Sequence, residues 1–324
     1  MAKFICVGGL VQDVFLSNSE ALVPVSDNGK WFERIELGGK FNVNKINFST
    51  GGGSSNAATT FARQGHKAIA LGVLGYDPAA DYVLTELDRE RISTEYIYRN
   101  RKYNTGYSMI LLAPNGERTI LTYRGSSTHY ELKHFDFEKA SEKGADWLYV
   151  TSLNGKMDIF KKLFLLAKAK NMKIAFNPGK KELKNSREML NVLSMVDVLI
   201  TNKEEMSQIV EGSTSRELML NALKLVPIAS ITDGRRGAMV GDGRFLFSVG
   251  LYDNIRKTID RTGAGDAFGS GLIVKLAEGR NLKEAIHFAA ANSSEVCQAV
   301  GAKTNILRAG SRLHAMDIKI SQLW

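Results

Sequence analysis

The chain has 324 residues, of which 44% are hydrophobic and 24% are charged. This composition excludes a disordered chain, and a chain of this length can bury a sizeable core without disulfides or a structural metal. Lys and Arg number 43 against 34 Asp and Glu, a net charge of +9 that favours anionic partners. The basic residues are scattered and form no basic tail, so we expect no nucleic-acid binding.

The N-terminus and the cysteines indicate where the chain works. Residues 4–7 are apolar, but this run is short and Gln12 and Asp13 follow it, so it predicts a buried strand and not a signal peptide. No apolar run approaches the length of a membrane span. Cys6 and Cys297 have neither disulfide nor zinc-site spacing, so we expect free thiols in a reducing cytoplasm.

The first irregular region follows the opening strand. Residues 31–37 and 41–48 are two extended segments around Gly38-Gly39-Lys40, a pattern that predicts a hairpin. Their polar and apolar residues alternate only loosely. We therefore expect a small β flap, a lid, outside the main core.

Two helices begin with capping residues. Ser54 or Ser55 is predicted to cap a helix that ends at Gly65. Asp77 is predicted to cap the next helix, and Pro78 occupies its first turn.

From residue 68 onward, strands alternate with helices. We predict strands at 68–73, 147–151, 173–177, 196–201 and 228–233, helices at 157–170, 203–210, 264–278 and 282–296, and a hairpin of 105–113 with 118–123 around Asn115-Gly116. This alternation predicts one α/β domain over residues 1–324 with a largely parallel sheet. Lid segments are expected at about 13–50 and 100–125.

Several predicted strands are followed by polar residues. These are Asp13, Asn177, Asn202, Asp233 and Asp260. Because ligands of open α/β sheets lie beyond the carboxyl ends of the strands, we expect these residues to share one cleft.

Residues 260–268 read Asp-Arg-Thr-Gly-Ala-Gly-Asp-Ala-Phe and precede a predicted helix. Glycines at a helix N-terminus leave N–H groups free to bind an anion, so residues 263–266 predict a phosphate cradle. Asp266, in the first turn, is placed to accept the proton of a hydroxyl that is being phosphorylated. The alternative is a glycine-rich loop in which Asp266 only caps the helix, and the length of the run favours the functional interpretation.

These nine residues resemble the C-terminal motif of the ribokinase family, the PfkB-type carbohydrate and nucleoside kinases. Three more segments occur in the family's order. Residues 52–58, Gly-Gly-Ser-Ser-Asn-Ala-Ala, resemble its N-terminal motif, residues 202–205 its Asn-x-x-Glu element, and residues 232–237 its Thr-x-Gly-x-x-Gly segment. Arg261 departs from the family, in which Thr is common at this position.

The resemblance implies a ribokinase-like three-layer α/β fold, a mostly parallel sheet between helices with a small β lid. It also implies ATP and Mg²⁺ as cofactors and transfer of the γ-phosphoryl group to a hydroxyl, a primary one by expectation. Asp266 would be the base, and Gly263, Ala264 and Gly265 would form the anion hole.

On the acceptor side, the resemblance implies that Asp13, Gly52, Gly53 and Asn56 hold substrate hydroxyls. Carboxylate and amide groups suit a polyol because together they accept and donate hydrogen bonds. Without the motifs, Asp13 would be a strand-end turn and Asn56 a helix cap.

On the nucleotide side, the resemblance places Asn202, Thr232, Gly234 and Gly237 near the phosphates. Glu205 would organise Mg²⁺ through water, since magnesium needs few protein ligands. The alternative is that Glu205 only complements a helix dipole.

Two further assignments are less direct. Asn292, on a late helix, is predicted to approach adenine, with local packing as the alternative. Asp260 and Thr262 resemble positions that bind a monovalent cation such as K⁺ in some members of the family. The sequence leaves open whether that site exists here.

The acceptor is also left open. Ribose or a ribonucleoside ranks ahead of a sugar phosphate or sugar acid, such as fructose 6-phosphate or 2-keto-3-deoxygluconate. Lys40 and Arg124 are the cations that would meet an anionic acceptor. A non-catalytic sugar sensor on the same fold is the rival from another class. No Walker motif occurs, which disfavours a P-loop enzyme.

Four lid aromatics have more than one possible role. Trp31, Phe32, Phe41 and Phe48 would line a pocket for a nucleoside base, pack the lid, or cover a dimer interface. We expect a homodimer through the lid.

Overall fold

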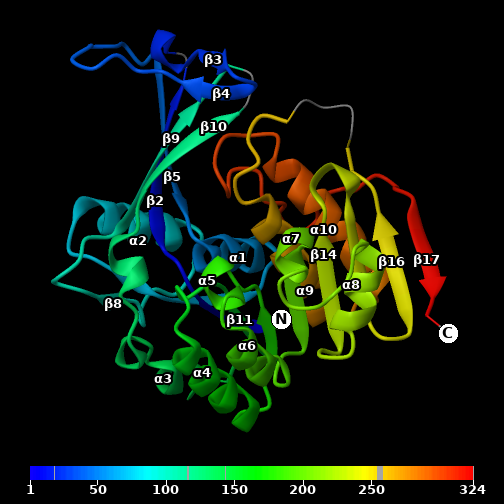
Figure 1. Ribbon diagram of the computed structural model, residues 1–324. Coiled ribbons are helices and arrows are strands. Elements are labelled where there is room, and N and C mark those ends of the chain that lie inside the picture. Colours follow the sequence, from blue (N-terminus) through cyan, green and yellow to red (C-terminus); the bar gives the residue numbers. More distant parts are fainter. Residues whose placement is uncertain (18, 115–116, 143, 254–257, 324) are drawn as a thin grey trace.

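The computed structural model describes residues 1–17, 19–114, 117–142, 144–253 and 258–323. A nine-stranded sheet forms its centre (Figure 1). The strands are β6 (Lys67–Leu71), β1 (Lys3–Val7), β11 (Trp147–Val150), β12 (Lys173–Phe176), β13 (Val198–Asn202), β14 (Ile228–Thr232), β15 (Ala238–Gly241), β16 (Phe245–Val249) and β17 (Ile318–Gln322), in spatial order. Neighbours from β6 to β14 are parallel, and those from β14 to β17 are antiparallel. The predicted, largely parallel α/β sheet is confirmed.

Helices cover both faces of this sheet. One face packs against α3 (Phe137–Glu142), α4 (Met157–Ala169), α6 (Ser186–Leu193), α7 (Lys203–Met206) and α8 (Ser215–Ala222), and the other against α1 (Gly53–Arg63), α2 (Pro78–Arg89), α9 (Ala264–Ala277) and α10 (Leu282–Val296). Alternate residues of β1 enter the two cores: Ile5 and Val7 one, Phe4 and Cys6 the other. The result is the three-layer fold that the sequence predicts.

A second sheet stands above this body, and we call it the lid sheet. Its strands are β10 (Arg118–Tyr123), β9 (Gly106–Leu112), β2 (Val11–Ser17) and β5 (Lys45–Gly51), in spatial order. Both predicted lid segments contribute strands to it. The hairpin of β3 (Pro24–Asp27) and β4 (Lys30–Glu33) lies at its outer end, at the top of Figure 1.

The predicted hairpin of 31–37 with 41–48 is wrong. Strand β4 pairs with β3, whereas β5 pairs with β2. The turn falls instead at Asn28-Gly29, where both residues have positive φ, 48° and 73°. Asn-Gly is a strong hairpin turn signal, and the sequence interpretation passed over it. The pairing of β9 with β10 is confirmed, and its turn residues 115–116 lie outside the described residues.

Helix starts were predicted with mixed success. Asp77 caps α2 as predicted, and its Oδ1 accepts the N–H of Ala80 at 2.9 Å. Helix α1 begins earlier than predicted, with Gly52 as its cap, so Ser54 and Ser55 are not caps. Both serines lie buried in the first turn, where Ser54 donates to the carbonyl oxygen of Cys6.

The remaining elements connect these layers. They are the strands β7 (Val73–Leu74) and β8 (Tyr98–Arg99), helix α5 (Lys180–Leu183), and the 3-10 turns η1 (Glu20–Leu22), η2 (Gly125–Thr128), η3 (Leu132–His134) and η4 (Gly234–Arg236). Helix α7 ends at Met206, one turn short of the predicted 203–210. Among the described residues, no helix combines the length and apolar character that crossing a bilayer needs.

Candidate active site

The N-terminus of α9 forms the centre of the predicted site. Gly263 caps this helix in the left-handed conformation, with φ of 80°, and a Cβ there would lie 2.5 Å from Cβ of Ala302. The N–H of Ala264 donates to the carbonyl oxygen of Arg261 at 3.3 Å, so it is already engaged. A Cβ at Gly265 would meet nothing within 4 Å. The next two N–H groups of the first turn, those of Gly265 and Asp266, are therefore the candidates for binding an anion, because the space beside Gly265 is open.

Asp266 and Asn56 are brought together from opposite ends of the chain. The amide nitrogen of Asn56, on α1, donates to Oδ2 of Asp266, on α9, at 2.7 Å. Burial raises the pKa of Asp266, and the Asn56 hydrogen bond opposes that shift. The other amide atom of Asn56, Oδ1, is buried without a partner in the described structure. The contact thus joins a carboxylate to an amide whose oxygen can still accept a hydrogen bond.

Gly52 and Gly53 are needed for packing at the start of α1. Gly52 has φ of 91°, and a Cβ there would collide with the carbonyl of Gly9. A Cβ at Gly53 would lie 2.5 Å from the side chain of Thr151. The start of α1 therefore lies against the loops that follow β1 and β11, and Asn56 stands in the first turn of that helix.

Asp13 lies within β2 of the lid sheet, and not at the end of a body strand as the sequence suggested. It is 6% exposed, and Ser49 and Ser108 flank it on the neighbouring strands. Burial raises the pKa of Asp13 to about 6, although a hydrogen bond from Ser108 and the charge of Lys303 oppose the shift.

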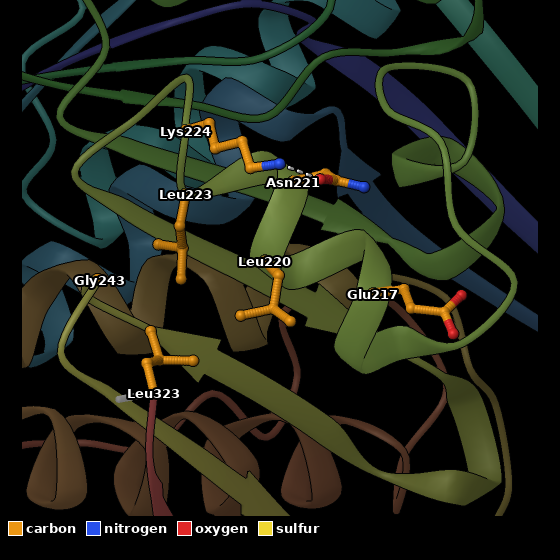
Figure 2. Close-up of a pocket in the computed structure, with 7 residues that line it drawn as sticks. All are labelled: Glu217, Leu220, Asn221, Leu223, Lys224, Gly243 and Leu323. Atoms are coloured by element: carbon orange, nitrogen blue, oxygen red, sulfur yellow. Dashed lines mark hydrogen bonds between the residues drawn. The ribbon is translucent and has the colours of Figure 1, made fainter.

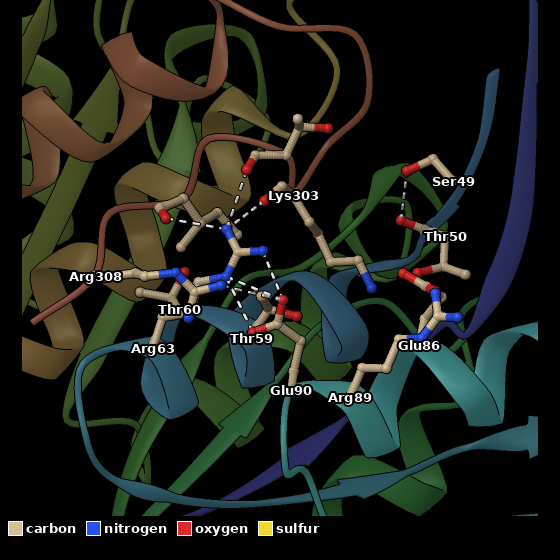
Figure 3. A network of polar contacts seen from close by, with 12 residues as sticks. Ser49, Thr50, Thr59, Thr60, Arg63, Glu86, Arg89, Glu90, Lys303 and Arg308 are labelled. Carbon is tan, nitrogen blue, oxygen red and sulfur yellow. Dashed lines mark hydrogen bonds and ion pairs between the residues drawn. The ribbon is translucent and has the colours of Figure 1, made fainter.

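Lys303 is a buried cation that the sequence analysis missed. Its ammonium donates to Oγ of Ser55 at 2.7 Å, next to Asn56, and burial lowers its pKa to about 8. Figure 3 shows Lys303 extending from its loop toward Thr50. Arg63 holds that loop by donating to the carbonyl oxygens of residues 303, 304 and 306 while pairing with Glu90.

The Asn-x-x-Glu element forms a reciprocal cap at the end of β13. The N–H of Glu205 donates to Oδ1 of Asn202 at 2.8 Å, and the N–H of Asn202 donates to Oε2 of Glu205 at 2.9 Å. Burial raises the pKa of Glu205, the hydrogen bond from Asn202 opposes that shift, and the charges of Glu204 and Asp266 add to it. Glu205 fits a water-mediated Mg²⁺ ligand, because magnesium keeps most of its waters.

Thr232 pairs with Asn202 across β14 and β13, so both lie at one edge of the sheet. The turn that follows contains Gly234 and Gly237, and a side chain at Gly237 would collide with the carbonyl of Val249. In this turn Nε and Nη2 of Arg236 donate to the two carboxylate oxygens of Asp233, each at 2.8 Å. These hydrogen bonds lower the pKa of Asp233.

Asp260 is buried and is held by the loops around it. Its Oδ1 accepts the N–H and the hydroxyl of Thr262 at 2.9 and 2.7 Å, and its Oδ2 accepts the N–H of Gly301 at 3.0 Å. The guanidinium of Arg118, from lid strand β10, lies 4.0 Å from Oδ1. In the described structure no strand runs directly into Asp260, contrary to the prediction.

Asn292 lies in helix packing rather than in open space. It is fully buried, its amide nitrogen donates to the carbonyl of Ala267, and its Oδ1 accepts the N–H of Leu307. These bonds occupy the groups that adenine recognition would use, so the structure corrects the predicted role. Arg261 is exposed at the start of the cradle.

Glu182 is a second residue that the sequence analysis missed. It is fully buried and accepts hydrogen bonds from the N–H groups of Leu153, Gly155 and Gly179 and from the hydroxyl of Ser152. Its carboxylate joins the loops after β11 and β12. A glutamate three residues after Gly179 has capping-box spacing, which was the available signal.

A separate pocket lies away from the predicted site residues. A pocket of about 390 Å³ lies beside α8, and Figure 2 shows its lining, with Lys224 bonded to Asn221. None of the predicted site residues lines it.

A model of the pfkB family carbohydrate kinases matches residues 20–309. The chain belongs to the pfkB family. As a pfkB-family kinase it is a phosphotransferase that acts on a sugar hydroxyl, and ATP binding follows from that membership.

This pfkB-family kinase is 28% identical over 262 residues to the 2-dehydro-3-deoxygluconokinase of Haemophilus influenzae, covering 74% of this chain and 82% of that protein. It is 26% identical over 265 residues to the ribokinase of Staphylococcus aureus, covering 79% and 84%. A putative ribokinase II from Escherichia coli, solved with ATP and Mg²⁺, has a TM-score of 0.78 at 20% identity, covering 95% of this chain and 96% of that one. That likeness confirms the ribokinase-like fold.

Proposed function

We propose that this kinase transfers the γ-phosphoryl group of ATP to a hydroxyl of a neutral sugar or ribonucleoside, with Asp266 as the base. The observation that carries the proposal is the 2.7 Å hydrogen bond from Asn56 to Asp266. It joins a carboxylate in the first turn of α9 to an amide whose oxygen has no partner in the described structure, and no side chain caps the N–H groups of that turn. A polyol hydroxyl can donate to one of these groups while its oxygen approaches the phosphate.

The chemical step needs one proton acceptor and one anion site. The acceptor hydroxyl gives its proton to Asp266 as its oxygen bonds to the γ-phosphorus, and the bond from that phosphorus to the β–γ bridging oxygen breaks to release ADP. The N–H groups of Gly265 and Asp266, with Gly263 and Ala264 shaping the turn, stabilise the negative charge of the transferred group. Catalysis is mainly positioning and charge stabilisation.

We place the nucleotide phosphates along the edge formed by Asn202, Thr232, Gly234 and Gly237. Glu205 would hold Mg²⁺ through water, and the bound ion would neutralise phosphate charge. The related structure solved with ATP and Mg²⁺ supports this choice of cofactors.

We assign Asp260 and Thr262 to a monovalent-cation site. The carboxylate of Asp260 accepts three hydrogen bonds among the described residues, and a carboxylate offers about four lone-pair positions, so room for one ligand remains. Arg118 competes for that position from the lid.

A neutral acceptor is favoured by Asp13. Its buried carboxylate would accept hydrogen bonds from sugar hydroxyls together with Asn56 and would disfavour an anion at that end of the cleft. Lys40 and Arg124, the cations considered for an anionic acceptor, are exposed. The alternative, a sugar-acid or sugar-phosphate acceptor, is supported by the relative named 2-dehydro-3-deoxygluconokinase.

We further propose a homodimer through the lid, working in the cytoplasm. Trp31, Phe32 and Phe48 are 72%, 45% and 54% exposed, an apolar surface that a second copy of the chain would cover. Cys6 and Cys297 are free thiols, as expected in a reducing compartment. Light scattering of the purified chain measures the oligomeric state.

The test of the proposal is ADP release with Mg·ATP against ribose, adenosine, cytidine, fructose, fructose 6-phosphate and 2-keto-3-deoxygluconate, with and without K⁺. We expect saturable turnover with a neutral sugar or nucleoside. Turnover only with the anionic acceptors would overturn the substrate class. ATP binding without turnover on any acceptor would favour a sugar sensor.

A further inference from the structure

The contact between Asn56 and Asp266 has a buried counterpart one helical turn below it. Residues four apart lie on the same face of a helix, so Thr60 follows Asn56 on α1, and Ser270 follows Asp266 on α9. The hydroxyl oxygens of Thr60 and Ser270 lie 2.8 Å apart, and both residues are 0% exposed. The two helices are thus joined by polar contacts at two successive turns.

The hydroxyl of Ser270 also reaches the backbone of the proposed base. It donates to the carbonyl oxygen of Asp266 at 2.6 Å. A serine hydroxyl carries one proton, so both short contacts are satisfied when Thr60 donates to Ser270. The distance from Thr60 to the carbonyl oxygen of Asn56 is 3.5 Å, which is too long to compete.

The packing around α9 lets this hydroxyl pair fix the separation of α1 and α9. Gly269 packs against β11 and β13, where an added Cβ would lie 2.8 Å from Ile200 and 2.9 Å from the hydroxyl of Tyr149. Helix α9 therefore cannot move closer to the sheet. A buried hydroxyl that loses its partner keeps its full desolvation cost, so the pair favours one separation of the two helices.

We propose that Thr60 and Ser270 are positioning residues that set the distance between the acceptor-binding Asn56 and the base Asp266. The inference rests on the proposed function. Neither side chain touches a reacting atom, and both act through the backbone and helix spacing. A misplacement of about 1 Å at a reacting centre can lower a rate about 100-fold, so a spacer of this kind affects turnover.

The test compares Thr60→Val and Ser270→Ala with Thr59→Val on the accepted substrate. Thr59 is the matched control, because it is equally buried on α1 but donates to the carbonyl oxygen of Ser55 and not to α9. We expect Thr60→Val and Ser270→Ala to lower kcat about 10- to 100-fold while the KM for ATP stays within about twofold. Thr60→Ser, which keeps the hydroxyl, should restore kcat.

The pH profile separates positioning from loss of stability. The hydrogen bond from Asn56 lowers the pKa of Asp266, so weakening it should raise that pKa. Because the base acts when deprotonated, the acid limb of the plot of kcat against pH should then move to higher pH. Glu205 of α7 and the Tyr149 hydroxyl of β11 also interact with Asp266, and the substitutions leave both unchanged.

Equal kcat and an equal acid limb for Thr60→Val, Ser270→Ala and Thr59→Val would overturn the inference. The inference also fails if all three variants lose activity in proportion to a lower unfolding midpoint. Absence of turnover in the unsubstituted chain would instead refute the proposed function itself.

Discussion

The carboxylate of Asp13 is buried in the lid sheet without an ion pair to any described residue. Its pKa is raised to about 6 by burial, against about 3.9 in an unfolded chain. Between these two values the folded chain binds the proton more tightly than the unfolded chain does. Asp13 therefore destabilises the fold increasingly as the pH rises through this window.

Replacing Asp13 by Asn should remove this pH dependence. A shift of two pKa units corresponds to about 3 kcal/mol, so the unsubstituted chain should lose about that much unfolding free energy relative to Asp13→Asn between pH 4 and pH 7. Urea unfolding of both proteins at several pH values measures the difference. Parallel curves for the two proteins would show that Asp13 does not titrate in this window.

A local sequence pattern can mark individual candidate residues. Asp266 and Asn56 stand in glycine-rich motifs, and the structure joins them by a hydrogen bond, while their roles stay predictions. Thr60, Ser270 and Lys303 were not found, because a hydroxyl or amine acquires its role from partners more than 200 positions away. Asn292 shows the converse: a polar residue on a late helix was given a ligand role, but packing uses its side chain.

Among the elements, the parallel strands and helices α9 and α10 were predicted well because long apolar periodicity marks them. Strands β15, β16 and β17 were missed, since an antiparallel edge carries a weaker pattern than a buried parallel strand. The error in the lid came from choosing the turn at Gly38-Gly39 over Asn28-Gly29.

The loops at the carboxyl ends of β11 and β12 depend on Glu182. Its carboxylate accepts from three N–H groups and one hydroxyl, and a glutamine would place two donors where acceptors are needed. Glu182→Gln should lower the unfolding free energy by about 2–4 kcal/mol.

Urea unfolding tests this prediction, with Glu188→Gln as the control. Glu188 is exposed on α6, so its substitution should change stability by less than about 0.5 kcal/mol. Equal midpoints for the two variants would mean that the Glu182 hydrogen bonds contribute little.

For the whole molecule, Arg118 links the lid sheet to the body. Its guanidinium lies 4.0 Å from Asp260, and its Nε is buried without a partner in the described structure. A closed lid would exclude water from the proposed transfer step, so we expect this contact to favour productive use of ATP.

Replacing Arg118 by Met should favour the open lid. A weak ion pair contributes about 0.5–1 kcal/mol, so the KM for the acceptor should rise about 2- to 5-fold, and ATP hydrolysis without transfer should increase. Lys45→Met is the control, because Lys45 is an exposed cation on lid strand β5. Identical kinetics of the two variants would show that Arg118 does not hold the lid.

The most direct test of the whole account is the rate of phosphoryl transfer by Asp266→Asn. Asparagine keeps an oxygen that can accept from Asn56, so the fold of the site should persist, but it cannot accept a proton. We predict a fall in kcat of about 100- to 10,000-fold with ATP affinity within about threefold. A variant that keeps more than about a tenth of the native rate would contradict Asp266 as the base.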